Sequence, residues 1–554
     1  MRLFKDMEDL NIQAIQLGLK NKTKNNMKYW RSGCLVGVLL FWVLPIYGQA
    51  WRAAAEQRIE QYRKGPLKVR VLDAQGKPIP DAQVHVRMTR HAFGFGTAVS
   101  FGLVLGTGYN PTYRAKLADL TGDGRTFNMA TPENALKWPS WEGEWPISNR
   151  RKIDVINWLL AKGYEIRGHN LLWPDWQWMP DDIGQNRNNP QYIYDRVRNH
   201  IAALAGHRDI RGKLRDWDVL NEPAHLTALR DVFNGWGSYE RGEDFYVDVF
   251  KWAKAADSTA RLYINEYNII NNYANEQPTR NYYKWIIARL IAKGAPIEGI
   301  GIQGHISAPL PSMSEVKAAL DEMAVFGLPL AITEFDVTSV SEEVEANFMR
   351  DFLTMVFSHP AVESFVMWGF WSGAHWRNNA PIFRADWSLK PSGQVFLDLV
   401  FRRWWTDTTG VTGPDGSWSV RGFLGDYAVE VRVGEASFTK IVRLTSPQDT
   451  TVLDVVVSGV NVGERPAEEW LKVKGFGPDP FVEGTTLHYW LGRPAQVKLA
   501  VYDVLGRQVY TTAGRRVAGW HTEWVDANGW SSGLYLYQLQ VEDQVHTGRM
   551  VKMQ

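Results

Sequence analysis

Polar side chains stand at the ends of short apolar segments in the central part of the chain. Glu222 follows one such segment, Glu266 the next and Glu334 a later one. Two carboxyl groups on different strands suit glycoside hydrolysis, in which one stays protonated to donate to the leaving oxygen and the other attacks the anomeric carbon as a carboxylate. Since three glutamates are available, counting alone does not assign these two roles.

Between His91 and Phe401, eight strand-like segments alternate with longer segments whose apolar residues have helical spacing. This is the pattern of a (β/α)8 TIM barrel. A doubly wound α/β sheet is the alternative, but such sheets usually have fewer strands and often a glycine-rich phosphate loop, which is not evident here. The eight expected strands are 93–99, 127–130, 165–172, 214–220, 261–264, 297–306, 328–335 and 364–370. A barrel carries its active site at the carboxyl ends of its strands, which is where the polar residues fall.

Two segments carry a resemblance to a known family. DWDVLNEP (216–223) and ITEFD (332–336) resemble the catalytic signatures of family 10 glycoside hydrolases, the retaining endo-β-1,4-xylanases. Segments 131–138, 167–173, 301–305 and 368–371 are similar to the family's other barrel motifs and occur in the same order. The likeness covers about residues 91–402, so we expect the catalytic barrel there.

The resemblance implies a role for each matching residue. Glu222 would be the acid/base and Glu334 the nucleophile, and Asn221 would bind the 2-hydroxyl of the reacting sugar. His305 and Asp336 would keep Glu334 ionised and oriented, whereas Glu266 would have a supporting role. The implied substrate-binding residues are Glu133, Asn134, Lys137, His169, Trp173, Gln303, Trp368 and Trp376. No metal and no cofactor is implied.

The expected substrate is xylan or a related β-1,4-glycan. A mixed-linkage glucanase and a non-catalytic glycan-binding surface protein are the alternatives. The chain departs from the common family pattern after Trp173, because Pro174 and Trp176 stand where His and Gln are usual. The second sugar's subsite is therefore altered, and we expect Trp176 or Trp178 to stack there instead.

Residues 1–50 are expected to be a signal peptide. A basic start at Met27 precedes an apolar run, 34–47, and a small-residue cleavage pattern. Translation could instead begin at Met27. The alternative to a cleaved signal peptide is an uncleaved membrane anchor. The single cysteine, Cys34, lies in this leader, so its removal would leave no thiol.

A small Ig-like β-domain is expected on both sides of the barrel. After a helix over 51–65, the segments 67–73 and 83–88 alternate like strands and predict a hairpin. Short alternating strands return after Thr408. A lone hairpin is marginally stable, so we expect 66–90 and 405–458 to form one discontinuous domain with the barrel inserted.

The C-terminal part of the chain carries a second resemblance. A polar stretch rich in Gly and Pro, 459–480, predicts a linker. Residues 481–554 resemble the type IX secretion sorting domain, type A form, on the segments 485–489, 501–507, 518–521, 532–537 and 550–552. This implies a partner in the type IX machinery and export through the outer membrane of a Gram-negative bacterium, to a secreted or cell-surface location. An appended carbohydrate-binding module is the alternative.

Composition sets the remaining limits. Lys and Arg number 62 against 60 Asp and Glu, a formal net charge of +2, so nothing suggests a nucleic-acid partner. Aromatic residues make up 13% of the chain; most would fill cores, but flat rings also stack on sugars. We expect a monomer.

Overall fold

The computed structural model describes residues 50–143, 147–457, 470–542 and 544–553. Except for Ala50, the expected signal peptide lies outside these residues. Residues 50–62 are helical, close to the N-terminal helix that the sequence predicts. Among the helices described, none is both long and apolar enough to cross a membrane.

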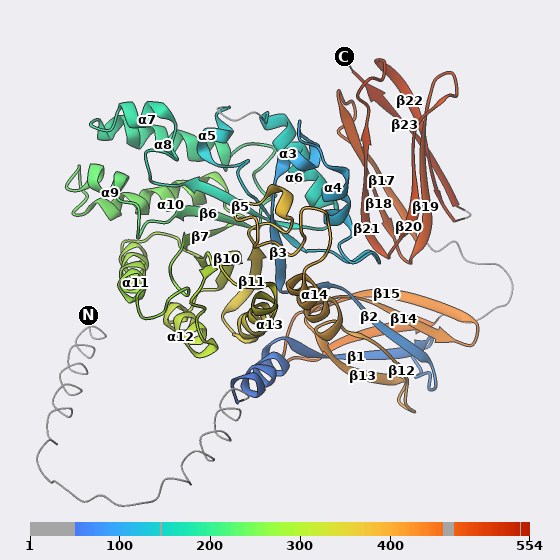
Figure 1. Ribbon diagram of the computed structural model, residues 1–554. Coiled ribbons are helices and arrows are strands. Elements are labelled where there is room, and N and C mark those ends of the chain that lie inside the picture. The colour runs from blue at the N-terminus through green and yellow to red at the C-terminus, as the bar shows by residue number, and fades with distance from the viewer. Residues whose placement is uncertain (1–49, 144–146, 458–469, 543, 554) are drawn as a thin grey trace, which may run out of the picture. The chain divides into compact units, whose positions relative to one another are not determined.

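Eight parallel strands close into a barrel (Figure 1), which confirms the predicted fold class. They are β3 (Gly94–Val99), β4 (Met129–Pro132), β5 (Glu165–Leu172), β6 (Asp216–Asn221), β7 (Arg261–Glu266), β8 (Gly299–Ile302), β10 (Leu330–Thr338) and β11 (Val362–Met367). Strand β11 pairs with both β10 and β3, which closes the ring. A short strand, β9 (His305–Ser307), pairs with the carboxyl end of β10.

The barrel strands are buried almost throughout their length. In β5 only Glu165 is partly exposed, and β4 and β6 are buried at every position. Parallel strands covered on both sides carry near-continuous apolar runs for this reason. Polar side chains buried at the strand ends are therefore exceptions that need partners.

Helices surround the barrel, and several begin with a side-chain cap. The helices are α3 (Phe101–Leu105), α4 (Pro111–Ala118), α5 (Trp138–Trp141), α6 (Asn149–Ala161), α7 (Asp181–Gln185), α8 (Pro190–Leu204), α9 (Ala228–Phe233), α10 (Phe245–Ala256), α11 (Gln277–Ala292), α12 (Met313–Ala324), α13 (Glu342–Ser358) and α14 (Pro391–Asp398). Three short helical turns are η1 (Gly242–Asp244), η2 (Ser372–Ala374) and η3 (Leu399–Arg403). Helix α8 begins with Pro190 after Asn189, whose side chain accepts from the Tyr192 N–H. Ser312 and Glu315 form a capping box at the start of α12.

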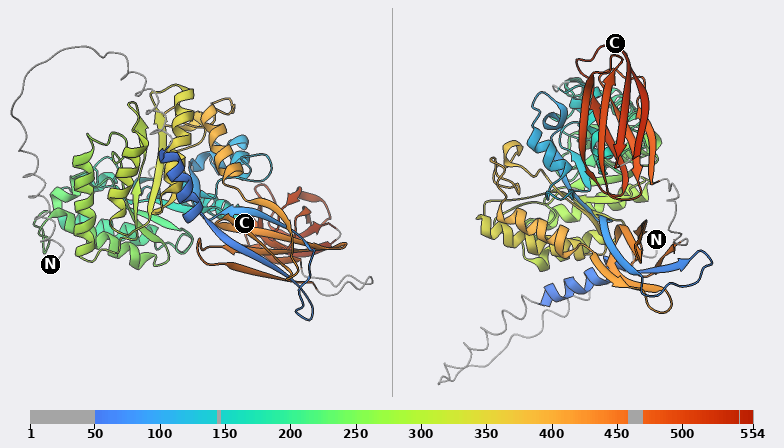
Figure 2. Two further views of the ribbon diagram at one scale, coloured as in Figure 1. Left: turned by 90° about the horizontal axis from the view of Figure 1, so that it is seen from below. Right: turned by 90° about the vertical axis from the view of Figure 1, so that its right-hand side faces the viewer.

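Strands from both flanks of the barrel pair with one another. These strands are β1 (Lys64–Asp73), β2 (Gln83–His91), β12 (Asp407–Val411), β13 (Ser417–Phe423), β14 (Gly425–Val433), β15 (Ala436–Leu444) and β16 (Thr451–Val457). One sheet has the order β13-β1-β16 and the other β12-β2-β14-β15. Figures 1 and 2 show blue β1 and β2 among the orange strands. On this pairing we propose one discontinuous β-domain with the barrel inserted.

The predicted hairpin between 67–73 and 83–88 is wrong. Strand β1 pairs with β13 and β16, whereas β2 pairs with β12 and β14, so the two strands belong to different sheets. Each strand alternates buried and partly buried positions, and strands from beyond the barrel pair with both of its edges. Alternation identifies a half-buried strand, but it does not identify the partner.

The C-terminal strands form two further antiparallel sheets. They are β17 (Leu471–Gly477), β18 (Gly484–Leu491), β19 (Ala495–Asp503), β20 (Gln508–Arg516), β21 (Gly519–Asp526), β22 (Gly533–Val541) and β23 (Gln544–Lys552). The sheet orders are β17-β18-β21 and β20-β19-β22-β23, around a core that includes Leu487 and Tyr537. Part of the expected linker is therefore strand, because β17 pairs with β18.

Candidate active site

Glu222 follows directly after β6 at the mouth of the barrel. It has a φ of 59°, in the left-handed region that residues other than glycine rarely adopt. Its Oε1 accepts a hydrogen bond from Gln303 Nε2 over 2.7 Å, and its Oε2 accepts one from Trp173 Nε1 over 2.8 Å. Strained backbone of this kind clusters at functional sites.

The surroundings of Glu222 favour its protonated form. Burial, together with the neighbouring carboxylates of Glu266 and Glu334, raises the pKa of Glu222 to about 7. The hydrogen bonds that the carboxyl group accepts act in the opposite direction, but they are outweighed. A carboxyl group with this pKa can hold a proton near neutral pH and give it to a substrate.

Glu334 lies within β10 and is only 4% exposed. Its Oε1 accepts from Asn265 Nδ2 over 2.8 Å, and its Oε2 lies 3.3 Å from His305 Nε2. These donors stabilise a charged carboxylate. The two glutamates at the mouth therefore lie in contrasting environments.

His305 lies between two carboxylates. Its Nε2 faces Glu334, and its Nδ1 lies 3.0 Å from Asp336 Oδ2. Burial alone would lower the pKa of His305, but Asp336 and Glu334 raise it to about 9. The pairing of β9 with β10 produces this contact, because His305 and Asp336 are opposite one another in the register.

Asp336 has two further donors on the loop after β11. Its Oδ2 accepts from Trp376 Nε1 over 2.9 Å, and its Oδ1 accepts from Arg377 Nη1 over 3.0 Å. Trp376 is 55% exposed, and its ring lies edge-on to His305 at 4.9 Å. The sequence motifs predict no role for Arg377, because its contact with Asp336 joins two segments far apart in the chain.

Asn265 lies at the carboxyl end of β7, a polar strand end for which the family motifs predict no role. Its Nδ2 donates to Glu334 and to Asn221 Oδ1, the latter over 2.9 Å, and its Oδ1 accepts from Thr333 over 2.7 Å. Asn221 and Asn265 are register partners on neighbouring strands. The position of Asn265 at a strand end was the available signal.

Asn221 is 1% exposed, and its amide nitrogen has no partner among the described residues. A buried donor without a partner is costly, unless a ligand or water accepts from it. This donor is therefore available to a hydroxyl group bound in the barrel mouth.

Lys137 connects two of the expected substrate-binding groups. Its Nζ donates to Asn134 Oδ1 over 2.7 Å and lies 4.9 Å from the centre of the Trp173 ring. Burial lowers the pKa of Lys137 and raises that of Glu133. Asn134 is exposed, whereas Lys137 is almost fully buried.

His169 and Trp368 face each other across the mouth. Their rings are edge-on, with centroids 5.0 Å apart. His169 Nδ1 lies 3.0 Å from Asp218 Oδ2 and 3.9 Å from Glu334 Oε1. Asp218 in turn accepts from Arg167, and both are buried. The described barrel thus brings the expected catalytic and substrate-binding side chains to one end.

Glu266 is fully buried and already satisfied within the protein. Its oxygens accept from the Ala224 N–H over 2.7 Å, from His225 Nδ1 over 2.8 Å and from its own neighbour, the Tyr267 N–H, over 2.9 Å. Burial raises its pKa. Its effect on Glu222 is electrostatic, which suits the expected supporting role.

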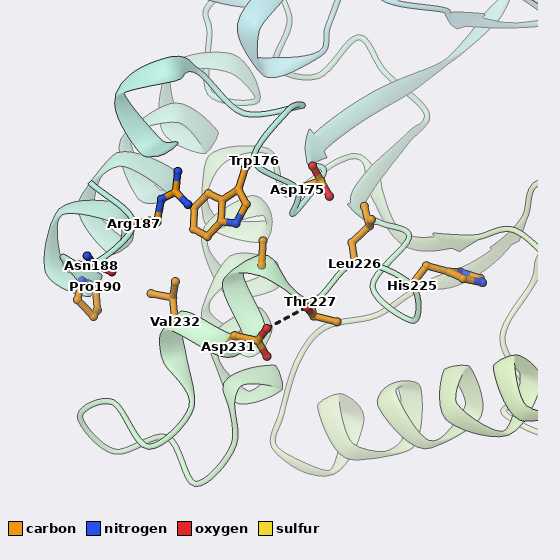
Figure 3. A pocket seen from close by; sticks show the side chains of 11 residues that line it. Asp175, Trp176, Arg187, Asn188, Pro190, His225, Leu226, Thr227, Asp231 and Val232 are labelled. Carbon is orange, nitrogen blue, oxygen red and sulfur yellow. Dashed lines mark hydrogen bonds between the residues drawn. The ribbon is translucent and has the colours of Figure 1, made fainter. Parts of the chain in front are cut away.

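The two tryptophans after Pro174 lie in different places. Trp178 stacks on Trp173 with centroids 4.3 Å apart and planes 3° apart. Trp176 instead lines a separate pocket of about 640 Å³ (Figure 3).

Among the described residues, no group of three or more His, Cys, Asp or Glu side chains could hold a metal ion.

The closed barrel and the polar side chains gathered at its mouth are those of a (β/α)8-barrel glycoside hydrolase. Residues 87–398 match the sequence model described as glycosyl hydrolase family 10, and the chain belongs to this family. Residues 478–553 match the secretion system C-terminal sorting domain, the type IX form. Both predicted resemblances are confirmed.

The relatives of this chain have names of two kinds, one regulatory and the other enzymatic. The chain is 30% identical over 411 residues to "Anti-sigma-I factor RsgI6" of Acetivibrio thermocellus, covering 74% of this chain and 50% of that protein. It is 30% identical over 390 residues to "Endo-1,4-beta-xylanase 1" of Arabidopsis thaliana, covering 70% and 38%. The chain thus spans half or less of the length of these curated relatives.

The chain is also similar to solved structures. The crystal structure of xylanase 10B from Thermotoga petrophila in complex with xylobiose is 24% identical. The match covers 56% of this chain and 95% of that chain, with a TM-score of 0.47.

Proposed function

We propose that the protein is a secreted endo-1,4-β-xylanase that cleaves internal xylan bonds with retention of configuration. Family membership and the name of the Arabidopsis relative support the substrate class. The observation that carries the proposal is the contrast between Glu222 and Glu334. Burial and two carboxylates favour a proton on Glu222, whereas Asn265 and His305 donate toward Glu334.

In the first step, Glu334 attacks the anomeric carbon as a carboxylate. The bond from that carbon to the leaving oxygen breaks, and the proton of Glu222 moves to this oxygen. Asn221 donates its unpartnered amide N–H to the 2-hydroxyl of the reacting sugar. A contact of this type strengthens as positive charge develops on the ring.

In the second step, water hydrolyses the covalent bond between the sugar and Glu334. Forming the glycosyl ester removes the charge of Glu334, which is one of the causes that raise the pKa of Glu222. The carboxylate of Glu222 then accepts a proton from water, whose oxygen attacks the anomeric carbon. Glu334 leaves as a carboxylate and is again stabilised by Asn265 and His305.

The remaining side chains of the mouth bind the sugars. Glu133, Asn134 and Lys137 hold the sugar next to the reacting one, on the non-reducing side. The reacting sugar is enclosed by His169, Trp173, Gln303, Trp368 and Trp376. The exposed ring of Trp376 gives a sugar an apolar surface to stack on, while its N–H holds Asp336.

The decisive experiment is nucleophile rescue. Wild type should release reducing sugar from xylan and far less from carboxymethyl-cellulose, and Glu334→Ala should lose about 10⁴-fold or more in kcat. Azide should restore turnover of an activated xyloside, giving the α-azide with Glu334→Ala and the β-azide with Glu222→Ala. The exposed Glu343→Gln is the matched control. Reversed azide products would exchange the two roles.

A non-catalytic glycan-binding protein is the second candidate, because one relative bears a regulatory name. The pair Glu222 and Glu334, each with its own donors, supports hydrolysis instead. Folded wild-type protein that binds xylan and cleaves neither polymer would establish the second candidate. Faster cleavage of mixed-linkage glucan than of xylan would make the protein a glucanase.

We further propose that the C-terminal domain directs export across the outer membrane. The match of residues 478–553 to the sorting-domain model supports this proposal. Deleting these residues in a host with type IX secretion should leave xylanase activity in the cell extract and remove it from the medium and the cell surface. Unchanged export of the shortened chain would refute it.

A further inference from the structure

The pocket beside the catalytic mouth is formed by two loops. Asp175, Trp176 and Arg187 come from the segment between β5 and α8, whereas His225 and Thr227 come from the turn between β6 and α9. Figure 3 shows the Trp176 ring beside the Arg187 side chain, with Asp231 and Thr227 on α9 and the turn before it. The pocket volume of about 640 Å³ exceeds what ordered water alone requires.

Both loops also carry the groups around Glu222. The Asp175 N–H donates to the Trp173 carbonyl over 2.8 Å, and Trp173 donates to Glu222. On the other side, the His225 N–H donates to the Glu222 carbonyl over 3.2 Å. The pocket lining thus begins two residues after Trp173 on one loop and three residues after Glu222 on the other, so the pocket adjoins the Glu222 site.

Of the charged side chains in the pocket, His225 pairs with Glu266 over 2.8 Å, whereas Asp175, Arg187 and Asp231 have no ionic partner among the described residues. Arg187 Nε donates to the Gly184 carbonyl, Asp231 accepts from Thr227 over 2.9 Å, and Asp175 accepts from the Gln177 N–H. Two carboxylates and one guanidinium group thus face the pocket with hydrogen-bonding capacity left over.

This set matches a neutral ligand with many hydroxyl groups. Hydroxyls can donate to Asp175 and Asp231 and accept from Arg187, while the Trp176 ring offers an apolar surface. Because the charge of His225 is offset by Glu266, the pocket has two carboxylates against one unpaired cation, and the negative charge of a uronate would be unfavourable there. The guanidinium carbon of Arg187 lies 5.7 Å from the centre of the Trp176 ring, so ring and cation can contact one ligand together.

We propose that this pocket binds a neutral pentose unit of the substrate, either an arabinosyl branch or a xylosyl residue of the main chain. The inference rests on the proposed xylanase function. It assigns to Trp176 a role outside the stack of Trp173 and Trp178, and it gives the departure from the common family pattern a function in substrate selection.

The test compares kcat/KM on three substrates: linear xylohexaose, arabinoxylan and glucuronoxylan. The variants are Trp176→Ala and the conservative Asp231→Asn, with Trp285→Ala on α11 as a matched control. Thermal melting establishes that each variant is folded. For an arabinosyl branch, both pocket variants should lose about tenfold on arabinoxylan beyond any loss on the other two substrates. For a main-chain xylose, KM should rise about tenfold on all three substrates while kcat changes little.

Two results would overturn the inference. A loss confined to glucuronoxylan would identify an acidic ligand, and losses no larger than those of Trp285→Ala would leave the pocket without a role in binding. These results differ from a failure of the proposed function, in which wild type would cleave none of the three substrates.

Discussion

The side-chain amide of Asn265 donates to Glu334 Oε1 over 2.8 Å. The same nitrogen lies 2.9 Å from Asn221 Oδ1, so one amide connects the proposed nucleophile with the proposed sugar-binding residue. Thr333 fixes the orientation of this amide by donating to its oxygen. Asn265 therefore holds Glu334 and Asn221 in a fixed relation to one another.

Replacing Asn265 with Ala should lower kcat on xylan by about 10²- to 10³-fold, the usual cost of losing one preorganised donor. KM should change far less, because Asn265 is a positioning residue that acts through Glu334 and Asn221. The exposed Asn347→Ala serves as the control. A variant with normal kcat and a raised KM would contradict this role.

Gly301 tests the same amide from the neighbouring strand. It is the register partner of Asn265, and a Cβ at this position would lie 2.3 Å from Asn265 Oδ1. Gly301→Ala should therefore displace Asn265 and lower kcat by at least tenfold. Gly102→Ala is the matched control, since a Cβ there would meet nothing within 4 Å. Equal activity of the two variants would show that Asn265 can shift without effect.

The barrel and the residues of its mouth could be predicted because parallel strands leave clear signals. Each of the eight expected segments contains or overlaps a barrel strand, since buried apolar runs stand out between helical patterns. The family motifs then placed Glu222, Glu334 and His305. The roles themselves stay predictions until the variants are measured.

Contacts between distant segments could not be predicted in the same way. Arg377 reaches Asp336 from the loop after β11, and its local sequence carries no sign of this. Likewise, the alternation of polar and apolar residues in β1 and β2 does not show that the two strands belong to different sheets. In both cases the partner is set by the folded chain and not by the local pattern.

The pH dependence of cleavage should reflect the proton on Glu222. Because its pKa is raised to about 7, kcat/KM should fall as pH increases above about 7, where the acid loses its proton. Glu266→Gln removes a carboxylate that contributes to this shift, so the basic limb should move to lower pH. The exposed Glu343→Gln should leave it in place. A basic limb that stays fixed in Glu266→Gln would exclude the electrostatic role of Glu266.

The raised pKa of Glu222 also predicts that the site costs stability. In the folded chain the pKa of Glu222 is about 7, against an ordinary value of 4.5 for a glutamate, so the folded state binds the proton more tightly. Below pH 4.5 both states are protonated and no cost arises. As pH rises from 4.5 through 7, ionisation favours the unfolded state, with a limit of about 3 kcal/mol above pH 7.

Glu222→Gln should therefore raise Tm at pH 8 by about 2–5 °C and leave it nearly unchanged at pH 4, while abolishing the acid function. Differential scanning calorimetry at both pH values measures this, with Glu343→Gln as the exposed control. A gain of the same size at pH 4 and pH 8 would point to packing instead of charge. The variant should be more stable and inactive for the same reason. Burial of Glu222 destabilises its carboxylate form, and this keeps the carboxyl group protonated so that it can act as the acid.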